Sequence, residues 1–242
     1  MWNRKLLKER AKDILRIRYW TVFLGCLIAG LLGGGSSSLF SFFPSSWNSS
    51  SSFGNKSPEL AVILLVIILF AVVFSFAFTI FVGNVITVGL RRYVMESRQA
   101  KPTLNVLFWG FQNGRYLKIV KTMCFYTLSI FLWTLLFIVP GIIKSYQYYY
   151  VPYLIADNPD IGSKRIFELS KQMTNGEKGK IFVLNLSFIG WYILGILTCC
   201  IGLLFLTPYT MATDAELYAF VRTRSIKINI TESGELKGFA PN

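Results

Sequence analysis

The stretch from Leu60 to Leu90 contains no charged residue. A helix of about 20 apolar residues crosses the roughly 30 Å hydrocarbon core of a bilayer, so a run of this length predicts a membrane-spanning helix. Similar runs recur along the chain, and only 15% of the residues are charged, against about 25% in soluble domains. The chain is therefore predicted to be an all-α, polytopic integral membrane protein.

Two interruptions set the predicted number of spans. Pro140-Gly141 divides the apolar stretch that begins at Ile119, and Thr198–Gly202 divides the stretch from Ile181 to Val221. Either stretch would be far too long for one crossing, so each interruption is interpreted as a tight turn between antiparallel spans. The prediction is one membrane domain, residues 1–225, with six spans in three hairpins at about 20–35, 60–90, 119–139, 141–156, 181–198 and 201–221.

The basic residues predict the orientation of the spans. Of 25 Lys and Arg residues, 23 lie in the N-terminal segment, the span 2–3 and span 4–5 connections, and the C-terminal segment. The positive-inside rule places these segments, and both termini, in the cytoplasm of a cell-membrane protein. The Ser-rich stretch 34–59 then becomes an outer loop and residues 226–242 a cytoplasmic tail. A cleaved signal peptide stays an alternative for span 1.

A net charge of +13 could also indicate nucleic-acid binding. The basic residues flank apolar runs instead of sharing one exposed face, so no nucleic-acid partner is predicted. The expected partners are the lipid bilayer and anionic lipid headgroups, with another membrane or cytoplasmic protein as a further candidate.

Three cytoplasmic segments have the periodicity of amphipathic helices, one before each predicted hairpin. They are Leu6–Ile17, the segment with Leu104, Leu107, Phe108 and Phe111, and the segment with Ile166, Leu169 and Met173. Asn-Gly follows the second and third, and we expect Gly114 and Gly176 to end them with positive φ. Such helices either lie in the headgroup layer, the favoured interpretation, or recruit a cytoplasmic partner.

The sequence offers no catalytic constellation. It has no histidine, which removes the commonest general base and a common metal ligand. Cys26, Cys124, Cys199 and Cys200 form no CxxC pair and are predicted to be small buried hydrophobes. We therefore expect no enzyme activity, no cofactor and no metal site.

Polar residues in or beside the predicted spans are the functional candidates, because a charge in the bilayer is costly. They are Lys144, Asp214, Glu216, Asn84, Arg91 and Arg92. Asp214 and Glu216 are expected to meet Arg91 and Arg92, either as structural ion pairs or in a transport pathway. Asn84 is expected to hydrogen-bond a neighbouring helix, and Lys144 to reach the outer interface.

The tyrosines of predicted span 4 suggest that this helix faces the bundle interior; they are Tyr146, Tyr148, Tyr149, Tyr150 and Tyr153. Pro152 would deprive the Tyr148 carbonyl of its helical donor, leaving it to a side chain. Asp157-Asn158-Pro159-Asp160 is interpreted as a turn and helix start at the inner surface.

Several strings also resemble a known family. They are Gly89-Leu90-Arg91-Arg92-Tyr93, Leu107-Phe108 with Phe111, Ile138-Val139-Pro140-Gly141-Ile142-Ile143-Lys144, Pro152-Tyr153-Leu154-Ile155-Ala156-Asp157-Asn158-Pro159, Ser187-Phe188-Ile189-Gly190-Trp191, Pro208-Tyr209, and in the N-terminal part Leu7-Lys8-Glu9-Arg10-Ala11-Lys12 with Tyr19-Trp20. With these strings the chain resembles the domain of unknown function 975 family. The resemblance implies a bacterial multi-pass membrane protein and supplies no activity, substrate or catalytic residue.

Two functions fit these predictions. The first is a non-enzymatic scaffold or accessory subunit that displays basic amphipathic helices to the cytoplasm. The alternative is a transporter or permeation path for a small solute, peptide or lipid, lined by span 4 with Asp214 and Glu216.

Overall fold

A computed structural model describes residues 4–31, 58–99, 102–112, 114–197, 201–231 and 234–236, and these residues form helices and turns without a strand. The predicted all-α class is therefore confirmed over this part of the chain. Nearly all of the predicted outer loop 34–59 lies outside the described residues, as do Cys199 and Cys200.

The described helices follow one another in the order α1 (Arg4–Leu31), α2 (Pro58–Phe78), the π-helix η2 (Thr79–Gly83), α3 (Asn84–Glu96), the 3₁₀-helix η3 (Leu104–Phe111), α4 (Tyr116–Leu136), α5 (Ile138–Gln147), α6 (Val151–Asp157), α7 (Ser163–Met173), α8 (Lys178–Leu186), α9 (Ile189–Leu197) and α10 (Ile201–Lys227).

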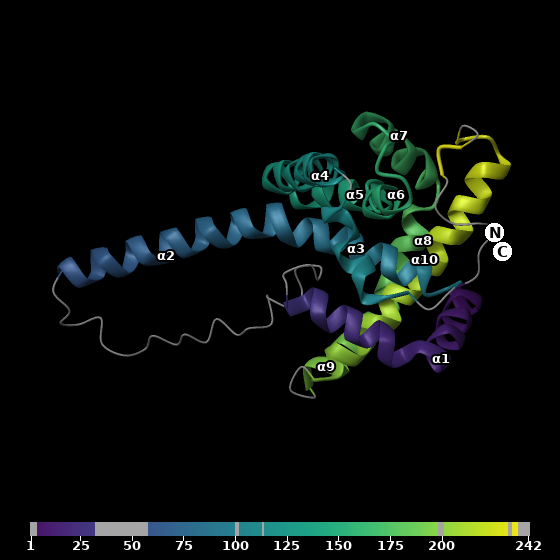
Figure 1. Ribbon diagram of the computed structural model, residues 1–242, viewed down its shortest axis with the longest axis horizontal. Coiled ribbons are helices and arrows are strands. Elements are labelled where there is room, and N and C mark those ends of the chain that lie inside the picture. The colour runs from purple at the N-terminus through teal and green to yellow at the C-terminus, as the bar shows by residue number, and fades with distance from the viewer. Residues whose placement is uncertain are drawn as a thin grey trace.

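The helix made of α2, η2 and α3 runs without interruption from the predicted outer side into the core. Figure 1 shows α2 extending away from the other helices. Large apolar side chains are exposed all round it, including Phe70, Val73 and Phe76. Such a surface is stable only in an apolar surrounding, which favours a position in lipid.

Three of the described helices are long and apolar enough to cross a membrane: Val62–Glu96, Tyr116–Leu136 and Lys178–Leu197. They correspond to predicted spans 2, 3 and 5. The apolar part of α1, Tyr19–Gly30, is shorter. Predicted spans 1, 4 and 6 have no counterpart among the three.

Predicted span 4 differs most from the structure. The chain leaves the helical conformation at Phe137 (φ −154°, ψ 140°), three residues before the predicted break at Pro140-Gly141. Pro140 lies in the first turn of α5, where its missing N–H costs no helical hydrogen bond. The span itself is two helices, α5 and α6, separated by a turn over Tyr148–Tyr150.

This turn also corrects the prediction for Pro152, which lies in the first turn of α6. The Tyr148 carbonyl accepts a hydrogen bond from the Val151 N–H at 3.1 Å. No side chain has to replace a helical donor there.

The core lies where α10 packs against α1, α3 and α9, and where α3 packs against α6 (Figure 1). All seven residues of α6 are buried. Tyr150 and Tyr153 pack against Tyr218 of α10, with ring centroids 6.0 and 5.3 Å away. The interior position predicted for the tyrosines of span 4 holds for these two residues.

The first and third predicted amphipathic faces are buried against the protein itself. Leu7, Ala11 and Leu15 of α1 are in the core, as are Ile166, Leu169 and Met173 of α7. Lys8 donates to Ser187 Oγ at 2.8 Å. Burial, together with Arg4 and Lys12, lowers the pKa of the Lys8 ammonium group.

The second segment is a 3₁₀-helix instead of an α-helix, so its four apolar residues do not share one face. Leu107 is buried, while Leu104, Phe108 and Phe111 are exposed. The backbone of η3 lies directly against α3 at Gly89. A Cβ at this position would lie only 2.1 Å from the Leu107 carbonyl oxygen, so the close contact requires glycine. The positive φ predicted after the second and third segments is confirmed at Gly114 (68°) and Gly176 (73°).

Candidate functional site

Helix α3 supplies three of the six predicted polar residues. Asn84 and Arg91 are seven residues apart and therefore lie on the same face, with Arg92 beside it. The π-helix η2 immediately precedes Asn84. A π-turn widens one turn of the helix, which sets the direction in which the residues after it point.

Arg91 and Asp214 meet among tyrosines. Arg91 Nη1 donates to the Tyr153 hydroxyl at 2.8 Å, and the guanidinium carbon lies 5.0 Å from the centre of that ring. Asp214 of α10 interacts electrostatically with Arg91 and with Tyr149. Arg91 and Asp214 are thus neighbours in charge, but they do not form the expected direct ion pair. We call Arg91, Tyr149, Tyr153 and Asp214 the Arg91 cluster.

Glu216 does not meet Arg91 or Arg92 as predicted. Its buried carboxylate pairs with Arg98, whose Nε lies 2.5 Å from Oε1. Arg92 instead pairs with Glu96 one turn further along α3, at 2.8 Å. Its Nη1 also donates to the Ala156 carbonyl oxygen at 2.8 Å, and its guanidinium lies over the Trp109 ring. Asp214 and Glu216 therefore belong to two separate sets of contacts.

Asn84 and Lys144, the other two predicted polar residues, lie in different surroundings. Asn84 Nδ2 is buried, and among the described residues it has no hydrogen-bond partner, so the predicted bond to a neighbouring helix is not formed through that atom. Arg91 Nε and the Tyr150 hydroxyl are likewise buried without a hydrogen-bond partner among the described residues. Lys144 Nζ lies 5.0 Å from the centre of the Trp133 ring and 5.6 Å from that of Tyr148.

A second charged set, around Asp157, was not predicted as a site. The side chain of Asp157 is fully buried, and its Oδ2 accepts from Arg222 Nε at 2.8 Å and from the Tyr218 hydroxyl at 2.9 Å. Tyr218 and Arg222 are four residues apart on α10, so both reach the same point at the end of α6. The sequence shows this four-residue spacing, but it does not show which acidic residue pairs with Arg222.

The segment after Asp157 forms the predicted turn. Asn158 Oδ1 accepts from the Asp160 N–H at 3.0 Å, which closes an Asx turn. Helix α7 then begins at Ser163.

Further ion pairs join the connections and the tail. Glu177, which precedes α8, pairs with Arg224 of α10. Lys118 of α4 pairs with Asp160 at 2.8 Å, and Arg165 of α7 pairs with Glu235 at 2.7 Å. Together with Arg98–Glu216 and Asp157–Arg222, these pairs connect three segments that the charge distribution assigns to the cytoplasm.

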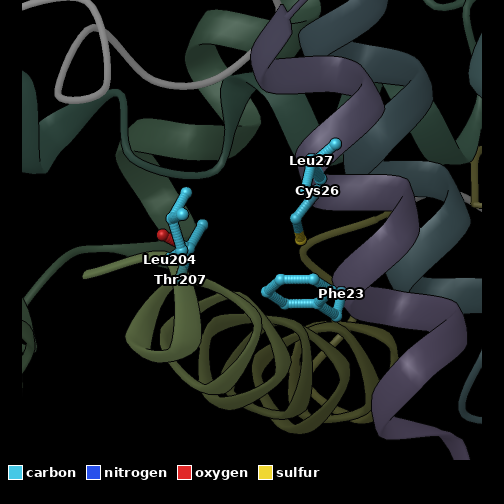
Figure 2. Close-up of a pocket in the computed structure, with 5 residues that line it drawn as sticks. All are labelled: Phe23, Cys26, Leu27, Leu204 and Thr207. Carbon is cyan, nitrogen blue, oxygen red and sulfur yellow. The ribbon is translucent and has the colours of Figure 1, made fainter. Parts of the chain in front are cut away.

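A small apolar hollow lies between α1 and α10. Figure 2 shows Phe23, Cys26 and Leu27 of α1 on one side of it, with Leu204 and Thr207 of α10 on the other. The Thr207 hydroxyl donates to the Leu203 carbonyl oxygen at 2.8 Å, so it does not offer its proton to the hollow. None of the six predicted polar residues lines it.

Cys26 is buried, and its thiol lies 3.6 Å from the Met211 sulfur. In the described part of the chain, no group of three or more His, Cys, Asp and Glu residues could hold a metal ion.

The fold and the charged sets define a class: an all-helical protein with three helices able to cross a membrane and with arginine–carboxylate pairs between its helices. Residues 136–225 match the family described as "Protein of unknown function (DUF975)", so this part of the chain is similar to that family. The family resemblance is thereby confirmed from the end of α4 to near the end of α10. No curated protein and no solved structure matches the chain.

Proposed function

We propose that the chain is a non-enzymatic, multi-pass protein of the cell membrane, with both termini in the cytoplasm, that acts as a scaffold or accessory subunit. The observation that carries this proposal is that the two acidic residues a transport path would use are already engaged. Glu216 is paired with Arg98, and Asp214 interacts with Arg91 and Tyr149. Groups held in this way stabilise a packed interior.

The ion pairs also support the proposed topology. Lys118 belongs to the predicted span 2–3 connection, Asp160, Arg165 and Glu177 to the span 4–5 connection, and Arg224 and Glu235 to the C-terminal region. Charged side chains can pair across these segments only if the segments lie together. A shared cytoplasmic side would bring them together.

Helix α7 offers the surface through which a scaffold would act. Its apolar face is buried, while Lys164 and Lys171 are exposed. A basic face that is not needed for packing is available for an acidic partner or for anionic headgroups.

Co-isolation tests the proposal directly. The tagged chain is crosslinked in native membranes, extracted in mild detergent and purified. We expect a second protein in a fixed ratio, and its loss when Lys164 and Lys171 are both changed to Glu. Lys227→Glu, at an exposed position near the end of α10, serves as the matched control and should retain the partner. Recovery of the chain with lipid alone would contradict the proposal.

One observation favours the alternative, a transport path. The buried Asn84 Nδ2, Arg91 Nε and Tyr150 hydroxyl lack partners among the described residues. Because an unsatisfied buried donor is unfavourable by about 1–3 kcal/mol, water or a solute would stabilise them. A wet interior is what a transporter requires.

Cysteine accessibility separates the two functions without a known substrate. In a chain whose four native cysteines are replaced by Ala, Asn84→Cys is treated with a membrane-impermeant thiol reagent in isolated membranes open to both sides. A scaffold with a packed interior leaves this cysteine unmodified. Rapid modification that is slowed by Asp214→Asn or Glu216→Gln would favour the transport path.

A further inference from the structure

The C-terminal segment folds back onto the body of the protein. After α10 ends at Lys227, Asn229 takes a positive φ of 54°, and Gly234 follows with 93°. Glu235 contacts the turn between α6 and α7, Ile230 contacts α7, and Leu236 contacts Arg222 of α10. The tail is therefore a bound segment, held by the chain's own side chains.

Three side chains hold the tail: Asn158, Arg165 and Arg222. Arg165 forms a two-point ion pair with the Glu235 carboxylate, Nε to Oε1 at 2.7 Å and Nη2 to Oε2 at 3.1 Å. The other contacts are hydrogen bonds to main-chain carbonyl oxygens of the tail. Arg165 Nη2 donates to that of Ile230 at 3.2 Å, Asn158 Nδ2 to that of Glu235 at 2.9 Å, and Arg222 Nη2 to that of Leu236 at 2.7 Å.

This pattern is typical of peptide recognition. Every peptide offers carbonyl oxygens, so three of the contacts require no particular sequence. Among the described tail residues, the Glu235 carboxylate forms the ion pair, Leu236 and Thr231 are buried, and Ile230 packs against the core. A segment with an acidic residue followed by an apolar one could repeat the ion pair and the contacts to main-chain carbonyl oxygens.

The receiving groups are fixed independently of the tail. Arg222 is held through Nε by the buried carboxylate of Asp157, which Tyr218 also contacts. Asn158 is part of the Asx turn before α7. The Arg165–Glu235 pair is only partly buried, with side chains 30% and 15% exposed, so water can reach it. Arg222 and Asn158 therefore keep their contacts within the body of the protein when the tail leaves.

We propose that Asn158, Arg165 and Arg222, here called the tail-binding surface, bind an acidic peptide segment of a cytoplasmic partner. The chain's own tail occupies the surface until that partner displaces it. This inference rests on the proposed scaffold function and names the chemistry of its partner. A tethered segment competes at an effective concentration on the order of millimolar, so the tail sets a threshold that only a stronger or multivalent partner exceeds.

A peptide-binding measurement tests the inference on the full chain in detergent micelles. The probe is a fluorescent peptide with the sequence of residues 228–236, followed by fluorescence anisotropy. We expect Glu235→Gln in the protein to raise peptide affinity at least about tenfold, because losing a charge-assisted pair weakens the competing tail. Truncation after Asn229 should raise it further, and adding Arg165→Ala to either variant should abolish binding.

Glu168→Gln is the matched control. Its carboxylate lies 4.0 Å from the same arginine on the same helix, and it takes no part in the hydrogen bonds to the described tail residues, so peptide affinity should stay at the native level. The tail-binding surface is ruled out if neither Glu235→Gln nor the truncation raises affinity while both keep the native melting temperature. Acidic recognition is ruled out if a peptide with Gln in place of its residue-235 Glu binds equally well. Binding as expected, with no partner recovered by co-isolation, would leave this surface standing and remove the scaffold function.

Discussion

At the scale of single residues, buried charged side chains form ion pairs with one another. The pair of Asp157 with Arg222 is the most deeply buried of them, with side chains 0% and 6% exposed. Removing one partner of such a pair leaves an uncompensated charge in a medium of low polarity. The pair is therefore expected to determine stability, whatever the protein transports or binds.

Two aspartates of the same turn provide the first test. Asp157→Asn should lower the free energy of unfolding by about 3 kcal/mol, because Arg222 and Tyr218 lose a charged acceptor. Asp160→Asn should change it by less than about 0.5 kcal/mol, because its pair with Lys118 is exposed. Denaturant unfolding of both variants in one detergent measures the difference. Equal losses would contradict the role given to Asp157.

The Arg91 cluster is tested by a double-mutant cycle. Arg91→Met and Asp214→Asn should each destabilise the protein by about 2–3 kcal/mol, because each leaves the other group without its counter-charge. The double variant should lose clearly less than the sum, with a coupling of about 1 kcal/mol or more. Additive losses, measured by thermal unfolding in one detergent, would show that the two groups do not stabilise each other.

Some of these contacts could be predicted from the sequence. An apolar span with an acid and a second span with an arginine at its end predict an interaction between the two, and Asp214 does interact electrostatically with Arg91. The Arg92–Glu96 pair follows from i, i+4 spacing and was available as a signal. The sequence gives no such signal for the pair of Glu216 with Arg98. Which of the neighbouring arginines pairs with Glu216 depends on packing between segments 118 residues apart.

At the scale of elements, two prolines mark where helices begin, whereas Pro208 lies inside α10. Pro140 and Pro152 both lie in the first turn of a helix, where proline is favoured, and the breaks precede them at Phe137 and over Tyr148–Tyr150. Interpreting Pro140-Gly141 as the turn itself misplaced the boundary, and interpreting Pro152 as a residue inside one continuous helix merged two helices. The 3₁₀ form of η3 depends on its contact with α3, which no local periodicity reveals.

That contact between η3 and α3 gives the third prediction. Gly89→Ala should lower the free energy of unfolding by about 2–3 kcal/mol, because the new methyl group would overlap the Leu107 carbonyl oxygen. Gly179→Ala, at an exposed helical position with open space around it, should leave stability unchanged or raise it by up to about 0.5 kcal/mol. Comparable losses in both variants would mean that η3 does not rest on α3 as described.

At the scale of the whole molecule, apolar surface is distributed in two ways. The predicted amphipathic faces of α1 and α7 are buried within the protein, while α2 exposes apolar side chains all round. The buried faces of α1 and α7 support a packed body whose basic residues are exposed to water. The exposed apolar surface of α2 favours lipid around this helix. Together they agree with a membrane protein whose cationic connections gather on one side.

That one-sided arrangement is the central claim, and cysteine labelling in intact cells tests it most directly. In a chain with its four native cysteines replaced, Asn175→Cys lies at an exposed position of the span 4–5 connection, and Ser51→Cys lies in the predicted outer loop. With a membrane-impermeant maleimide, we predict that Ser51→Cys is labelled in intact cells and that Asn175→Cys is labelled only after permeabilisation. Labelling of Asn175→Cys in intact cells would contradict the topology and, with it, the proposed cytoplasmic scaffold.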